Sequence, residues 1–149
     1  MKSTWVLLAN ASQARCYTRE NVNSPWTEVA GFADAWGRAK GSDLSEDRSG
    51  YEGTSLSRAG TSYSPRLSAK KKEHESFARQ LAEFLNQAVV DRRCQELVIF
   101  ASNPFLGELK SFLGEHAKQA LGRTLAIDLT SFTGPELARR IEQHLLPPR

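Results

Sequence analysis

Residues 97–101 read Leu-Val-Ile-Phe-Ala, and residues 5–9 read Trp-Val-Leu-Leu-Ala. Both runs are apolar along their whole length, which is typical of central strands that are buried on both faces. Such strands need helices on both sides of their sheet, because each apolar face must be covered. The two stretches therefore predict an α/β fold in which helical layers enclose a sheet.

The N-terminal third of the chain predicts two further strands. Polar turn residues at 10–13 follow the first apolar run, and residues 14–19 (ARCYTR) return as a second strand. A turn at 21–25 then leads to a third strand at 26–32 (WTEVAGF). Because the connections are short, we expect these three strands to form an antiparallel meander.

Downstream of residue 70 the hydrophobic period changes to that of helices. We expect helices at 71–93, from Asn103-Pro104 to Gly122, and from the Thr133–Glu136 capping-box pattern to the final prolines, with a last buried strand at 124–129. The predicted order is β-β-β-α-β-α-β-α. The sequence thus predicts a single domain over residues 1–149 with a mixed five-stranded sheet, similar to the ribonuclease H-like arrangement.

Composition narrows the class of protein. The chain has 149 residues, is 40% hydrophobic and carries a net charge of +3, as expected for one soluble domain of mildly basic character. Cys16 and Cys94 are the only cysteines and do not form a metal-binding motif, so we expect reduced structural thiols. The first apolar run is too short for a secretory signal, and no transmembrane segment is predicted, so we expect a cytoplasmic location.

The segment 33–72 stands apart from the regular elements. It is rich in Gly and Ser, mixes eight basic with five acidic residues and has no apolar run, so we expect a long flexible loop. Aromatic residues between cations suit single-stranded RNA, but they also suit a loop that folds back on the sheet, docks a protein or is simply solvated. The candidate binding residues are Arg48, Tyr51, Arg58, Tyr63, Arg66, Lys70, Lys71 and Lys72.

Catalytic patterns are weak in this sequence. A two-metal nuclease on such a fold needs carboxylates, yet Asn10 follows the first strand. Asp128 is a lone acid whose simplest role is polarity at a helix N-terminus or in a turn. His74, His116 and His144 fall on three different predicted helices, where surface or capping roles are expected. The glycines form no phosphate-binding pattern. We therefore expect no catalytic residues, no metal and no cofactor, and a hydrolase or nuclease is the less favoured alternative.

Five segments together resemble the bacterial host attachment protein family. In chain order they are WVLLANASQARCY (5–17), SDLSEDRSGY (42–51), HESFARQLAEFLNQA (74–88), LVIFASNPFLGELKSFL (97–113) and LTSFTGPELARRI (129–141). Two departures are Asn10, where the family often has Asp, and Ser102-Asn103-Pro104, where two prolines are frequent. The family name refers to attachment to plant host cells and does not by itself imply a biochemical activity.

The same family resembles the middle domain of archaeal and eukaryotic release factors. The resemblance implies that segment 33–72 occupies the place of the Gly-Gly-Gln tip of that domain. This chain has no Gln between residues 33 and 72 and no Gly-Gly pair, so the resemblance does not extend to peptide release. A non-enzymatic protein that binds RNA or the ribosome through this loop is the first hypothesis. A protein-interaction factor for attachment to host cells is the alternative, and the oligomeric state stays open.

Overall fold

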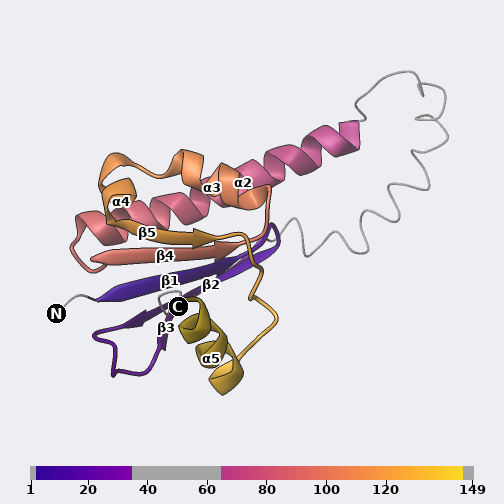
Figure 1. Ribbon diagram of the computed structural model, residues 1–149. Coiled ribbons are helices and arrows are strands. Elements are labelled where there is room, and N and C mark those ends of the chain that lie inside the picture. Colours follow the sequence, from indigo (N-terminus) through magenta and orange to yellow (C-terminus); the bar gives the residue numbers. More distant parts are fainter. Residues whose placement is uncertain (1–2, 35–64, 146–149) are drawn as a thin grey trace.

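A five-stranded mixed sheet with the strand order β3-β2-β1-β4-β5 lies at the centre of the molecule (Figure 1). The computed structural model describes residues 3–34 and 65–145. β2 is antiparallel to β1 and β3, whereas β4 is parallel to β1 and β5, which confirms the predicted mixed α/β fold. In chain order the elements are β1 (Thr4–Ala9), β2 (Gln13–Arg19), β3 (Thr27–Ala33), α2 (Pro65–Val90), β4 (Glu96–Ala101), α3 (Phe105–Phe112), α4 (Glu115–Ala120), β5 (Leu121–Leu125) and α5 (Gly134–Leu145).

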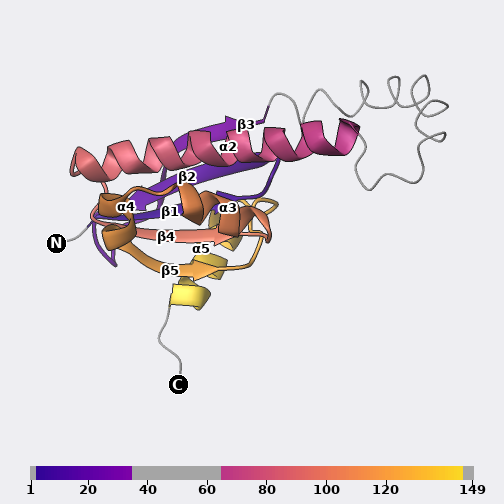
Figure 2. The same cartoon turned by 90° about the horizontal axis from the view of Figure 1, so that it is seen from above.

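Helices cover both faces of the sheet, as the apolar runs of β1 and β4 predict. α2, α3 and α4 lie on one face and α5 lies on the other (Figures 1 and 2). Successive side chains of a strand point to opposite faces. Trp5 and Leu7 therefore join the core beneath α2, whereas Val6 and Leu8 join a second core beneath α5 that includes Ile141.

α2 begins at Pro65, so residues 65–72 are helical rather than part of the expected loop. The expected start at residue 71 followed the hydrophobic period, and the first buried side chain described in α2 is Phe77. Proline is favoured at the first helical position, and Ala and Lys are good helix formers, so the helix extends beyond its buried face. Its last residue is Val90 because Arg92 adopts a left-handed conformation, with φ of 64°. The remainder of the expected loop, residues 35–64, lies outside the described residues.

The expected helix after Pro104 is two short helices. Pro104 occupies the N-cap position of α3, not the first helical position, and Asn103 does not cap it. The chain is extended at Leu113 and Gly114, between α3 and α4. At this break, the side-chain oxygen of Asn86 on α2 accepts a hydrogen bond of 2.8 Å from the Gly114 N–H. A hydrogen bond from another helix thus replaces an intrahelical one. The hydrophobic periodicity of residues 104–122 could not reveal this break.

The last strand lies earlier in the chain than the expected 124–129. β5 spans Leu121–Leu125 instead of 124–129, and it is an edge strand whose residues are half-buried or exposed. The buried Leu129 that suggested a longer strand lies in the connection to α5, where it packs into the core beneath that helix. The third strand also lies at an edge, so β3 is largely exposed.

Candidate nucleic-acid interface at one edge of the sheet

Four of the five strands end at the same edge of the sheet. β1, β4 and β5 are parallel, and β3 runs in the same direction because both it and β1 are antiparallel to β2. α2 leads back from this edge to the start of β4, so its N-terminal end lies here as well (Figure 1). Ligands of open α/β sheets characteristically bind outside the carboxyl ends of the strands. A functional site is therefore expected at this end of the strands.

The N-terminal turns of α2 carry a run of exposed cations. Lys70, Lys71 and Lys72 are all exposed, and none of the side chains described between residues 68 and 76 is buried. Residues 65–76 form about 18 Å of helix at a rise of about 1.5 Å per residue. Figures 1 and 2 show this end of α2 extending past the strands. The lysines thus lie on the first turns of a regular helix, where none of the described side chains is buried.

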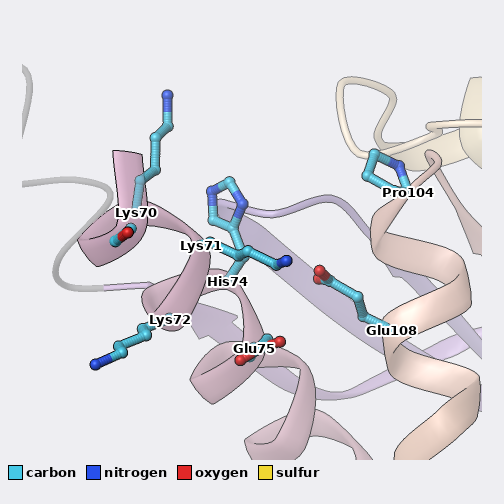
Figure 3. Close-up of a pocket in the computed structure, with 8 residues that line it drawn as sticks. Lys70, Lys71, Lys72, His74, Glu75, Pro104 and Glu108 are labelled. Atoms are coloured by element: carbon cyan, nitrogen blue, oxygen red, sulfur yellow. The ribbon is translucent and has the colours of Figure 1, made fainter. Parts of the chain in front are cut away.

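A groove of about 720 Å³ separates these turns of α2 from the start of α3 (Figure 3). Lys71 extends into it toward Glu108 on α3, whereas Lys70 and Lys72 point away from α3 on different sides of the helix. The groove is therefore of mixed charge. Its lining is Ser68, Lys70, Lys71, Lys72, His74, Glu75, Pro104 and Glu108.

The structure brings together only part of the predicted binding set. Lys70, Lys71 and Lys72 lie on α2, and Arg66 falls in the first turn of that helix. The remaining candidates, Arg48, Tyr51, Arg58 and Tyr63, lie outside the described residues. Pro104 and Glu108 are neighbours of the lysines that no sequence pattern indicates, because 30 positions or more separate them from the lysine run. His74 and Glu75, by contrast, lie within three residues of Lys72.

A second polar cluster lies at the end of β1. The Asn10 amide donates hydrogen bonds of 3.0 Å to the Asp128 carboxylate and 3.1 Å to the Thr130 hydroxyl. Asp128 also accepts from the Thr130 N–H at 2.9 Å and from its hydroxyl at 2.6 Å. Partial burial opposes ionisation of Asp128, but the bonds from Thr130 and Asn10 outweigh it and lower the pKa of the carboxyl. The expected turn role of Asp128 is confirmed, together with a bond to Asn10.

Arg15 on β2 holds the connection between β5 and α5 against the sheet. Its guanidinium donates bonds of 2.6 Å and 2.8 Å to the carbonyl oxygens of Thr130 and Phe132, and one of 2.7 Å to the Tyr17 hydroxyl. The donors and acceptors of this cluster form hydrogen bonds with one another, and these bonds hold residues 128–132 beside the end of β1. Within residues 3–34 and 65–145, no cluster of three or more His, Cys, Asp or Glu side chains could hold a metal ion. The described hydrogen bonds of this cluster indicate a structural role, since they join the ends of β1 and β2 to the connection between β5 and α5.

The two cysteines lie within the larger core. Cys16 on β2 and Cys94, which follows α2, are both free and buried, as expected of structural thiols. Burial raises the pKa of Cys94 to about 12, with a smaller effect of Glu96, and burial raises that of Cys16 further still. Thiolates, the reactive form, are therefore suppressed at neutral pH.

Comparison with known proteins gives the class of this α/β protein. The model of a family described as protein required for attachment to host cells matches residues 5–141. The chain belongs to this host attachment family. Among curated proteins no match was found.

The chain is similar to several solved structures, one of which is a phosphatase. That structure is the type II variant of the Ppx/GppA phosphatase of Aquifex aeolicus, with 7% sequence identity and a TM-score of 0.41. The match covers 84% of this chain and 35% of the phosphatase, so the chain spans about a third of that protein's length. At these values, the similarity carries no argument about function.

Proposed function

We propose that this member of the host attachment family binds RNA, free or within the ribosome, without catalysing a reaction. The proposal places binding on Lys70, Lys71 and Lys72 of α2, continued by the basic and aromatic residues of the adjoining segment. It also places the protein in the cytoplasm. Among the helices of the described residues, none is long and apolar enough to cross a membrane.

The exposed lysine run on the unpacked end of α2 carries the proposal. Between residues 66 and 75 the sequence has four basic and two acidic residues, and the first helical turn has no acidic residue. Helix N-termini favour negative side chains, so this charge pattern is not the one that would best stabilise the helix. Nor does packing require it, since no side chain described in α2 before Phe77 is buried. A polyanionic partner accounts for a basic surface that neither the helix nor the core needs.

Charge reversal tests this proposal without harming the fold. A variant with Lys70, Lys71 and Lys72 replaced by Glu should keep its helix, because Glu is a good helix former and suits the N-terminal end of α2. We expect RNA affinity at low salt to fall at least about tenfold, since cations near the phosphates are replaced by repelling carboxylates. A matched control reverses three exposed cations elsewhere, namely Arg92 after the end of α2, Lys110 on α3 and Lys118 on α4. Equal affinity of the lysine variant and the native protein, or binding insensitive to salt, would contradict the proposal.

A protein partner is the second candidate, and a different surface favours it. A groove of about 480 Å³ lies between α5 and the β2–β3 hairpin, with Trp26, Pro135 and Leu137 among its lining residues. Val22, at the hairpin tip, also lines this groove and is 76% exposed. Apolar side chains grouped around a groove are typical of protein-binding surfaces. Binding to a host or bacterial protein that survives high salt and is lost in Val22→Asp would favour this candidate.

A further inference from the structure

The three lysines of α2 do not form one flat patch. Consecutive residues of an α-helix are about 100° apart around its axis, since one turn takes about 3.6 residues. Lys70 and Lys72 are therefore about 200° apart. In Figure 3, the side chain of Lys70 leaves the helix on one side, that of Lys72 on another, and that of Lys71 between them toward α3. A surface that touches only one side of this helix cannot lie against both outer lysines.

The groove side of the helix is the less favourable side for a polyanion. Lys71 faces Glu108 there, and Glu75 lines the same groove. Two carboxylates offset the local positive potential, and close approach of a phosphate to them is repulsive. The side chains of Lys70 and Lys72 point away from Glu108 (Figure 3), so these two lysines are better placed than Lys71 to meet phosphates.

We infer that the partner of this helix end is a flexible single strand of nucleic acid that bends around it, with phosphates on both Lys70 and Lys72. A duplex holds its phosphates on a stiff frame, and A-form RNA has a major groove too narrow for such side chains to read. A single strand can bend around a helix of about 10–12 Å diameter and meet cations on opposite sides. This inference rests on the proposed function and specifies which form of nucleic acid is bound.

The test compares single variants on two forms of the same ligand. Lys70→Gln and Lys72→Gln each remove one charge while keeping a good helix former, and Lys118→Gln on α4 is the matched control. Fluorescence anisotropy would measure affinity for a labelled single-stranded RNA and for its duplex at several salt concentrations. We expect tighter binding of the single strand. Each of the two variants should lower that affinity about threefold at low salt and reduce the salt slope by about 0.7, because one phosphate contact is lost.

Two results would overturn the inference while leaving RNA binding intact. One is a duplex that binds as tightly as the single strand, and the other is a loss of affinity in only one of the two variants. By contrast, the proposed function itself would fail if neither ligand showed salt-dependent binding or if the triple charge reversal had no effect. Circular dichroism of each variant confirms that α2 is intact in either case.

Discussion

Asn10, directly after β1, donates a hydrogen bond of 3.0 Å to Asp128, which lies 118 positions further along the chain. This bond joins the end of the first strand to the connection that leads into α5. It also explains how a neutral side chain fits at this position, because the amide supplies the donor that Asp128 needs. A second carboxylate in its place would face Asp128 without a proton to share.

We therefore predict that Asn10→Asp destabilises the protein in a pH-dependent way. Two neighbouring carboxylates raise the pKa of one of them in the folded state, so the penalty is largest at neutral pH and shrinks as the pH falls and a proton is taken up. We expect a loss of about 1–3 kcal/mol in the free energy of unfolding at pH 7. Urea unfolding at pH 7 and pH 4.5 measures it, with Asn23→Asp in an exposed turn as the control. Equal losses at both pH values would rule out repulsion as the cause.

Asp128 should also contribute to the acid sensitivity of the native protein. Its pKa is lowered in the folded state, so its stabilising effect is present above the unfolded pKa and is lost as the pH falls through the folded pKa. Asp128→Asn should consequently lower stability at pH 7 but flatten the dependence of stability on pH below about 4. Denaturant unfolding as a function of pH checks this. The assigned role would be contradicted if the free energy of unfolding of the variant fell with acid as steeply as that of the native protein.

Neutralising Glu108 should strengthen RNA binding under the proposed function. Glu108→Gln removes the acid that Lys71 faces, so the positive potential of the groove rises. We expect affinity to improve about twofold at low salt and the gain to vanish at high salt, because exposed charges are then screened. Glu115→Gln, at an exposed position of α4, is the matched control. Weaker binding of Glu108→Gln would indicate that the acid itself contacts the partner.

The helix break at Gly114 should depend on Asn86. Asn86→Ala leaves the Gly114 N–H without the side-chain oxygen that accepts its hydrogen bond. We expect a loss of about 1–2 kcal/mol in the free energy of unfolding. Asn86→Asp keeps an acceptor for Gly114 and should cost less, which urea unfolding of the two variants can compare. Equal costs would mean that the bond to Gly114 is not what holds the break.

Neither cysteine should react in the native protein. Cys16 and Cys94 are 0% and 3% exposed, and burial raises the pKa of both thiols. A thiol reagent at pH 8 should therefore label both residues only after unfolding in guanidinium chloride. Rapid labelling of the folded protein would show that the core around β2 opens readily.

The sequence predicts those parts of the fold that local patterns encode. The apolar runs 97–101 and 5–9 correctly indicate central strands with helices on both faces, and the turn residues indicate the antiparallel hairpins. The end of α3 could not be predicted, because Asn86 reaches that position from another helix. The sequence predicts the start of α2 at residue 71 rather than Pro65, because hydrophobic periodicity indicates which residues are buried and not where the helix begins. The lysine run was visible, but its relation to Glu108 exists only in three dimensions.

The position of Phe77 has a consequence for how this family can diverge. The residues of α2 that pack in the core and the lysines to which the proposed function assigns binding occupy different parts of one helix, since burial described in α2 begins at Phe77 and the lysines precede it. Substitutions among the first turns can therefore change the chemistry of recognition with little effect on the core. Under the proposed function, substitutions confined to the first turns of α2 would be enough to change the partner, while the buried part of the helix keeps its packing.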